Sequence, residues 1–472
     1  MVSGCKEATG FMSTANVLIA NTSHEQRSPL GDRHGWGFVL LLLAVATLFL
    51  RPSDLIPALA TWPIYQLLIG CCLIVSARTT IIGFAQQQLV AQPATFSLLV
   101  LLLAVGLSHL SHGSVWGMRA STYEVGKLLA LYLLIVGLVN TPQRLVLLLR
   151  WLTVAISTVA ALALLDHFEV VSIAALASIQ QYGGVGAGEQ LMLERIRGTG
   201  IFQDPNDFGL ILVTGLVFCC SFLVQPNLGW LRYQWLLPGG VLLTALALTH
   251  SRGALLSLIC GVAALLAYYR GGKWGAWALL GLPLVALTFS ARMTNIDALH
   301  EGTGQARIQL WSDSLSVWRT YPMFGLGEGL LVDEIGMVTH NSFVHCYAEL
   351  GLFGGTAFLA SFLAAGLGLW SYRQAELTVD RPATNSPAAM LAHHGGFMFA
   401  ALVAYAAGMM TISRQFVAPT YLILGIATSA HSLCTGEVVR WRVGNAFLAM
   451  SVCCSLTSLL GFYIAIRLLV RW

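Results

Sequence analysis

The sequence predicts an all-α fold, a polytopic integral membrane protein with about 12 (12–13) transmembrane helices and two long periplasmic loops. Three observations predict it. Hydrophobic residues make up 57% of the 472 residues, only 10% are charged, and the apolar residues gather in long runs. A soluble globular domain carries about 25% charged residues, so this chain lacks the charge to cover a surface that faces water. A soluble enzyme, a disordered chain, a collagen and a disulfide scaffold are thereby excluded.

The apolar runs give the spans in order along the chain, each measured against the roughly 20 residues that a spanning helix needs. The spans fall near 36–50, 55–76, 95–110, 122–140, 144–165, 207–224, 234–249, 254–270, 274–290, 342–370, 396–412, 417–433 and 446–466. The first is short and the last ends near Arg467 and Arg471, so the count is twelve or thirteen. Together they form one multispanning membrane domain, 36–466. Residues 1–35 are expected to form a cytoplasmic N-terminal tail, because their weak apolar run does not resemble a cleaved secretory signal.

Lysine and arginine favour cytoplasmic loops, and they orient the predicted spans. With the tail inside, every short loop on the cytoplasmic side carries a positive residue: Arg78, Arg144, Arg232, Arg270 with Lys273, Arg373 with Arg381, and Arg440 with Arg442. Two long loops, Asp166–Asn206 and Ala291–Thr339, then lie on the opposite side. We find no repeat that relates the two halves, although many transporters are built from such repeats. The long loops are therefore the expected place for chemistry.

The net charge and the cysteines exclude two further classes of function. A net charge of +4, from 25 basic and 21 acidic residues, is too small and too scattered for a nucleic-acid surface. None of the ten cysteines forms a CxxC motif, so neither a zinc site nor a redox motif is supported. No cluster of metal-ligand carboxylates appears near the loops. The sequence thus predicts no cofactor, no metal and no nucleic-acid partner.

The first long loop ends in a polar segment, Arg195–Asp207, directly before an apolar helix. Asp204 or Asn206 suits the N-cap of that helix, and the intervening proline suits its first turn. One interpretation is a capped helix start and nothing more. The other is an anion site, because Arg195 and Arg197 lie beside a helix N-terminus.

A short turn between two spans, His250-Ser251-Arg252-Gly253, places an arginine on the side of the membrane that the positive-inside rule disfavours. Ser251 is expected to cap the next span. Arg252 either pairs with a carboxylate, extends its side chain along the membrane interface, or has a functional role.

The second long loop contains Ile308, Trp311, Leu315 and Trp318 at helical spacing, which predicts an amphipathic helix over Ala306–Thr320. Arg307 lies on its polar side, and the tryptophans are expected at the membrane interface. The glycine-rich segment that follows, 322–329, is better explained as a close-packed turn than as a phosphate loop. No strand precedes it and no lysine follows it.

The loop closes with Thr339-His340-Asn341-Ser342, and the next span begins. Histidine can exchange a proton near neutral pH, although a surface or capping role also suits His340. Glu349 lies inside the same span, where a carboxylate needs a partner or water. It could pair with an arginine, orient His340 or contact an acceptor sugar.

The order of these motifs resembles the O-antigen ligase and polymerase superfamily. The motifs are Arg197-Gly-x-Gly-x-Phe-x-Asp-Pro-Asn206, Ser251-Arg252-Gly253, Arg307-x-x-x-Trp311, Pro322-x-x-Gly325-x-Gly327, and His340-Asn341 with Glu349-x-Gly351-x-x-Gly354. The resemblance covers a core region, 195–358, with 291–341 as its main periplasmic loop.

The resemblance implies a glycosyltransferase of the bacterial inner membrane, with its active site facing the periplasm. Its partners would be an undecaprenyl-diphosphate-linked glycan donor, membrane lipid, and a lipid A-core or glycan acceptor. The family's active-site residues correspond by position to Arg252, Arg307 and His340. The candidate substrate-binding residues are Arg197, Arg195, Asn206, Asn341 and Glu349.

The residue chemistry agrees with that implication. Arginine binds phosphate through a bidentate fork, so Arg252 and Arg307 could hold a diphosphate and stabilise its departure. His340 could act as the general base that removes the proton of the attacking hydroxyl. We therefore predict a metal-independent single displacement with inversion at the anomeric carbon.

Three alternatives stay open. The first is a Wzy-type polymerase of lipid-linked repeat units, because its motifs are shared with ligases and with protein O-oligosaccharyltransferases. The second, from another class, is a transporter or flippase of a lipid-linked glycan. That reading needs charges along a central path, yet few charges lie in mid-span, Lys127 and Arg150 being the nearest candidates. The third is a membrane scaffold in which the arginines are dispensable.

Overall fold

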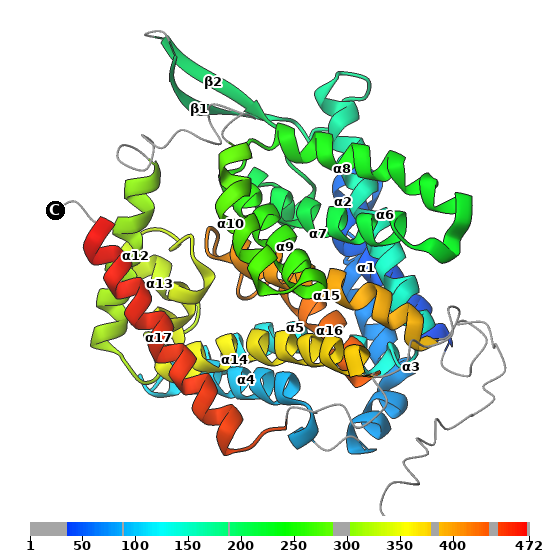
Figure 1. Ribbon diagram of the computed structural model, residues 1–472. Helices are drawn as coiled ribbons and strands as arrows, with labels where there is room; N and C mark the ends of the chain where they lie inside the picture. Colours follow the sequence, from blue (N-terminus) through cyan, green and yellow to red (C-terminus); the bar gives the residue numbers. More distant parts are fainter. Residues whose placement is uncertain are drawn as a thin grey trace, which may run out of the picture.

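The computed structural model describes residues 35–86, 89–186, 189–286, 303–378, 387–433 and 442–469. It is a bundle of helices with one two-stranded hairpin that extends away from it (Figure 1). The longer helices are α1 (Gly35–Leu50), α3 (Ile64–Gln86), α4 (Pro93–Leu110), α5 (Val115–Leu138), α6 (Pro142–His167), α7 (Pro205–Leu223), α8 (Leu236–Leu248), α9 (Arg252–Arg270), α10 (Gly272–Ala286), α12 (Thr303–Thr320), α14 (Ser342–Thr378), α15 (Pro387–Met409), α16 (Ala418–Ser432) and α17 (Asn445–Leu469). Short helices α2 (Pro52–Leu55) and α13 (Leu331–Ile335) lie in connections.

The predicted all-α membrane fold is confirmed. Each predicted span overlaps a helix of the structure. Within the described ranges, 8 helices are long and apolar enough to cross a membrane, and Gly35–Leu50 and Ile64–Arg78 are shorter apolar helices. The predicted tail 1–35 lies outside the described residues except for Gly35. So do Arg381, Arg440 and the first part of the loop predicted at 291–341.

The first long loop contains strands that the sequence analysis did not predict. Strands β1 (Ile179–Gly186) and β2 (Glu189–Arg195) pair antiparallel, with Ile179 opposite Arg195 and an irregularity between Tyr182 and Gly184. The hairpin ends where the Arg195–Asp207 segment starts. The loop therefore returns to the helical body at the point where that segment meets α7.

The second long loop contains the predicted amphipathic helix, α12, but its tryptophans do not face outward. Ile308 and Leu315 are buried, and Trp311 and Trp318 pack partly buried against the same core. The Trp311 indole N–H donates to the carbonyl of Thr339 at 3.0 Å, and its ring lies edge-on to Phe462 of α17. The apolar side of α12 thus packs on α14 and α17, and a position of the tryptophans at the membrane interface stays a prediction.

The long helix α14 is broken at Gly351, whose backbone angles are φ 65 and ψ −166. The loop between α12 and α13 fills the break. Four backbone hydrogen bonds join the loop and the helix. From the loop, the amide of Leu326 donates to the carbonyl of Ala348 at 3.0 Å and that of Gly327 to Glu349 at 2.9 Å. From the helix, the amide of Leu352 donates to the carbonyl of Pro322 at 2.8 Å and that of Phe353 to Met323 at 3.2 Å. In an apolar environment, backbone groups freed by a broken helix need such partners.

Two glycines allow this close approach of the loop to the helix. A Cβ on Gly351 would lie 2.3 Å from the backbone carbonyl carbon of Met323, and one on Gly325 would lie 2.2 Å from that of Glu349. Both residues also have positive φ, 65° and 75°, a conformation that side-chain-bearing residues rarely adopt. The predicted close-packed turn is thus a loop docked backbone to backbone into a broken helix.

Substituting either glycine should therefore destabilise the protein. We expect Gly325→Ala and Gly351→Ala each to cost at least about 2 kcal/mol, because strained backbone and overpacking each cost about 1–3 kcal/mol. The midpoint of SDS-induced unfolding of the purified protein measures this. Gly126→Ala is the matched control, since a Cβ there meets nothing within 4 Å. A loss of stability in the control equal to that of the two variants would contradict the prediction.

Candidate functional site

The starts of α7 and α9 are tied together by one side chain, Asn206. Its Oδ1 accepts hydrogen bonds from Ser251 Oγ at 2.8 Å and from Arg195 Nη2 at 3.1 Å. Arg195, only 3% exposed, also donates from Nε to the carbonyl of Thr249 at 2.6 Å and from Nη1 to Gln181. Two predicted substrate-binding residues, Arg195 and Asn206, thus connect the hairpin to the turn that presents Arg252.

The helix caps predicted at these starts are confirmed. Asp204 caps α7, its side chain accepting from the amide of Asn206 at 2.7 Å, and Pro205 occupies the first turn. Ser251 caps α9, its hydroxyl accepting from the amide of Ala254 at 3.2 Å. Arg252 is consequently the first residue of α9, beside the amide groups that a helix start leaves unpaired.

The segment that carries Arg197 is fixed to the N-terminal helices. The Thr199 hydroxyl donates to the carbonyl of Phe49 at 2.6 Å, and the amide of Gly200 donates to Asp54 Oδ2 at 2.9 Å. Arg197 itself donates from Nε to the carbonyl of Ala177 at 2.7 Å. Among the described residues, its hydrogen-bond partner therefore lies in the connection before β1, and not among the other predicted site residues.

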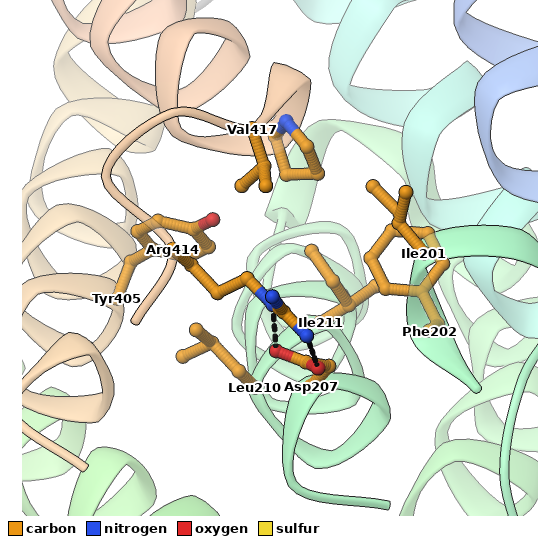
Figure 2. Close-up of a pocket in the computed structure, with 9 residues that line it drawn as sticks. Ile201, Phe202, Asp207, Leu210, Ile211, Tyr405, Arg414 and Val417 are labelled. Atoms are coloured by element: carbon orange, nitrogen blue, oxygen red, sulfur yellow. Dashed lines mark hydrogen bonds and ion pairs between the residues drawn. The ribbon is translucent and has the colours of Figure 1, made fainter. Parts of the chain in front are cut away.

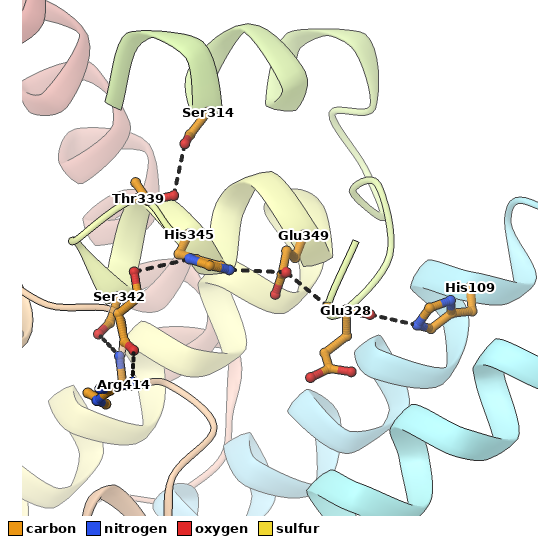
Figure 3. A network of polar contacts seen from close by, with 10 residues as sticks. His109, Ser314, Glu328, Thr339, Ser342, His345, Glu349 and Arg414 are labelled. Carbon is orange, nitrogen blue, oxygen red and sulfur yellow. Dashed lines mark hydrogen bonds and ion pairs between the residues drawn. The ribbon is translucent and has the colours of Figure 1, made fainter. Parts of the chain in front are cut away.

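His340 lies between two anchored neighbours at the start of α14. Thr339 is bound to α12 through its hydroxyl, 2.9 Å from Ser314 Oγ (Figure 3). Asn341 caps α14, its Oδ1 accepting from the amides of Phe343 and Val344 at 3.1 and 3.2 Å. His340 has a φ of 54, a left-handed conformation that is uncommon for a residue with a side chain. The backbone of His340 is therefore fixed on both sides.

Arg252, Arg307 and His340 come together at one place. The pKa of His340 lies below its ordinary value because the ring is partly buried and because Arg307 stands near it, with Asp204 acting in the opposite direction. The pKa of the Arg307 guanidinium is lowered by burial and by the nearby charge of Arg252, again opposed by Asp204. Charges act on a pKa in this way only at short range. Arg307 thus lies within electrostatic reach of Arg252, His340 and Asp204, which puts the three predicted catalytic residues in one neighbourhood.

The site contains an arginine that the sequence analysis missed, Arg414, in the loop 410–417 between α15 and α16. This loop is bound to the start of α14, because Ser342 Oγ donates to the carbonyl of Ile412 at 2.7 Å and accepts from the amide of Arg414 at 2.8 Å. It also touches the start of α9, where a Cβ on Gly253 would lie 2.2 Å from Thr411 Oγ1. The charge of Arg414 further lowers the pKa of His340.

Arg414 is paired with Asp207 in the first turn of α7. Its Nε lies 2.6 Å from Asp207 Oδ1, and its Nη2 bonds to Oδ2, which makes a two-pronged ion pair (Figure 2). Burial alone would lower the pKa of Arg414, but the hydrogen bond and charge of Asp207 raise it. A sequence signal for Arg414 did exist, because the predicted orientation puts the connection between 396–412 and 417–433, like the turn of Arg252, on the side that positive residues avoid.

Glu349 lies in a different contact network, beside the break in α14. Its carboxylate, 2% exposed, pairs with His345 Nε2 at 3.0 Å and accepts from the amide of Gly329 at 2.9 Å (Figure 3). His345 Nδ1 lies 3.1 Å from Ser413 Oγ. The expectation that Glu349 pairs with an arginine or orients His340 is wrong, because a histidine on the preceding turn of its own helix takes that place. The network instead joins the docked loop, α14 and the loop 410–417.

Beyond Glu349, the same network reaches α4. The main-chain carbonyl of Glu328 accepts from His109 Nε2 at 3.0 Å, while burial and the neighbouring Glu349 raise the pKa of the Glu328 carboxyl. Within the described ranges, no group of three or more His, Cys, Asp or Glu side chains is arranged as a metal site would require.

Comparison with known families agrees with the motif resemblance for the central part of the chain. Residues 239–359 match the O-antigen ligase family. The matched segment contains Arg252, Arg307, His340 and Glu349, together with the break in α14; Arg195, Arg197, Asn206, Asp207 and Arg414 lie outside it. A search of curated proteins found no match. The match thus supports the resemblance to the O-antigen ligase superfamily over this segment.

The contacts of Asn206 predict different outcomes for two substitutions. Asn206→Ala should lower stability by roughly 2–3 kcal/mol, because it leaves the buried Arg195 with one partner fewer. Asn206→Asp keeps an acceptor oxygen for Arg195 and Ser251 and should retain most of the stability. SDS-induced unfolding of both variants checks this. Equal destabilisation by alanine and aspartate would show that the Oδ1 contacts are not what matters.

Proposed function

We propose that this chain is a membrane glycosyltransferase that transfers a glycan from undecaprenyl diphosphate to an acceptor hydroxyl, in the manner of an O-antigen ligase. The observation that carries the proposal is the convergence of Arg252, Arg307 and His340, three residues from three separate helix starts or loops. All three lie inside the segment that matches the O-antigen ligase family. The positive-inside pattern favours the periplasmic side of the inner membrane for this site.

The arginines act on the diphosphate of the donor. When the bond between the anomeric carbon and the diphosphate oxygen breaks, negative charge develops on the phosphate oxygens. Arg252 and Arg307 stay ionised and can bind those oxygens through two parallel N–H bonds. The amide groups at the start of α9 add partial positive charge at the same place. Fixed positive groups that meet charge as it develops lower the barrier to departure.

His340 acts on the acceptor. The acceptor oxygen attacks the anomeric carbon from the face opposite the diphosphate, and its proton passes to the neutral imidazole of His340. A lowered pKa suits this role because it keeps the ring neutral near pH 7. The reaction is a single displacement with inversion, and we propose that it needs no metal, since the arginines hold the leaving group.

The other predicted residues divide into two groups in this proposal. Asn206, Arg195 and Asn341 hold the helix starts in place, as their internal hydrogen bonds indicate. Arg197 and Glu349 remain proposed substrate contacts: Arg197 is half-buried, and Glu349 lies beside the docked loop. The acceptor is a lipid A-core in the ligase reaction and the end sugar of another lipid-linked repeat in the polymerase reaction.

A transfer assay with defined variants tests the proposed chemistry. Purified protein is given an undecaprenyl-diphosphate oligosaccharide and candidate acceptors in the presence of EDTA. We expect His340→Ala to lower the rate by about 10²–10⁴-fold, the usual contribution of a general base. Arg252→Ala and Arg307→Ala should lower it at least as much, since they remove charge stabilisation of the leaving group.

Arg319→Ala is the matched control, because Arg319 is an exposed arginine of α12 that stacks on Tyr463 and takes no part in the proposed site. No product with any acceptor, or full activity of His340→Ala and Arg307→Ala, would overturn the proposal. A requirement for a divalent cation would overturn its metal-independent form. The product distinguishes a ligated conjugate from a polymer.

The acid limb of the pH–rate profile should report His340. Because the neutral imidazole is the active form, the rate falls as the pH drops through the pKa of His340. That pKa is lowered by burial and by the facing charges of Arg307, Arg414 and His345, with Asp204 opposing them, so the midpoint should lie below 6.5. The pH dependence of kcat/KM measures it. A midpoint at or above 6.5 would contradict the assignment.

A further inference from the structure

Arg414 makes no contact with the substrate in the mechanism proposed above, and it lies outside the segment that matches the O-antigen ligase family. Its backbone is nevertheless fixed at the site. The amide of Arg414 donates to Ser342 Oγ at 2.8 Å, and its carbonyl accepts from Thr420 Oγ1 at 2.7 Å. Ser342 lies two positions after His340. The backbone of Arg414, from which its side chain extends, is therefore held close to the proposed base, His340.

The guanidinium of Arg414 is open on one side. Its partner Asp207 is covered, with 5% of the side chain exposed, while 37% of the Arg414 side chain is exposed. Of the five N–H groups of a guanidinium, two bond to Asp207, and one donates to the carbonyl of Ser413 at 3.3 Å. The remaining two have no hydrogen-bond partner among the described residues. Figure 2 shows the carboxylate meeting one edge of the guanidinium.

Arg414 adds a second cation beside the proposed base. Its charge acts on His340 together with that of Arg307, and Asp204 opposes both. Like charges held together repel one another, so an arrangement of this kind is most stable when an anion occupies it.

We propose that Arg414 is a third anion-binding arginine of the site, that it contacts the diphosphate leaving group beside Arg252 and Arg307, and that Asp207 is the positioning residue that holds its guanidinium toward that ligand. The proposal deepens the proposed function and depends on it for the identity of the ligand. Asp207 acts through Arg414 by fixing the orientation of its guanidinium. Without that partner, the flexible side chain would lose more conformational entropy when it binds the ligand.

Binding of inorganic pyrophosphate to the full-length protein tests the anion site without requiring transfer. Arg414→Gln should weaken pyrophosphate binding by on the order of 10- to 100-fold, the worth of hydrogen bonds to a charged group. Arg414→Lys keeps the positive charge but not the two-pronged geometry of the guanidinium, so its pyrophosphate affinity should lie between those of wild type and Arg414→Gln. Asp207→Asn should also weaken binding, and Asp207→Glu should restore part of it. Arg319→Ala serves as the control with one exposed arginine removed.

The double variant Asp207→Asn/Arg414→Gln separates this role from a structural one. If the pair only stabilises the fold, removing both charges should restore wild-type pyrophosphate affinity, because no unpaired charge is left. If Arg414 binds the anion, the double variant should bind no more tightly than Arg414→Gln. In the transfer assay, the loss of Arg414 as an anion-binding residue should raise the KM for the lipid-linked donor. Gel filtration shows which variants fold. If Arg414→Gln does not fold, the pyrophosphate affinity of Arg414→Lys is compared with that of wild type instead.

Wild-type pyrophosphate affinity in folded Arg414→Gln or Arg414→Lys, or its recovery in the double variant, would overturn the inference. Failure of the proposed function looks different. Wild-type protein would then transfer no glycan while still binding pyrophosphate through Arg414. Normal transfer by wild type together with unchanged donor KM and pyrophosphate affinity in the Arg414 variants would overturn this inference alone.

Discussion

The site depends on how the protein repairs the break in α14. A helix interrupted at Gly351 leaves backbone carbonyls and amides unpaired, and an apolar surrounding offers no water to satisfy them. The 321–330 loop supplies the missing partners, and the glycines at 325 and 351 let the two backbones touch. Because the loop is held there, the segment that leads from it through α13 to His340 begins at a fixed position. Glu349, at the break, secures the same loop through the amide of Gly329.

Around that fixed point, the starts of several helices face one another. Asn206 ties α7 to the start of α9, Ser342 ties the start of α14 to the loop 410–417, and Thr339 ties the same end of α14 to α12. Helix starts carry partial positive charge and unpaired amides. Adding arginines to such an arrangement gives a site suited to anions. Asp204 and Asp207 oppose the charges of the arginines near them.

The sequence predicted well whatever depends on neighbours along the chain. Runs of apolar residues gave the helices, and single polar residues before them, Asp204 and Ser251, gave the caps. It failed where a contact joins distant segments. The hairpin was missed because the glycines of Gly183-Gly184-Val185-Gly186 weaken the alternation typical of a strand. The partner of Glu349 and the inward packing of Trp311 depend on how α14 and α17 cover their neighbours.

Arg414 is a different case, since the rule that singled out Arg252 applies equally to it. The predicted orientation puts both on the side that positive residues avoid. In the structure, the loop that carries Arg414 touches the residue after Arg252, since a Cβ on Gly253 would lie 2.2 Å from Thr411 Oγ1. In the proposed mechanism the arginines have two effects with one cause. Positive charge binds the departing diphosphate, and the same charge keeps a proton off His340. A variant that loses an arginine should therefore bind the donor less well and also protonate its base at a higher pH. Donor binding and readiness of the base are thus coupled through electrostatics.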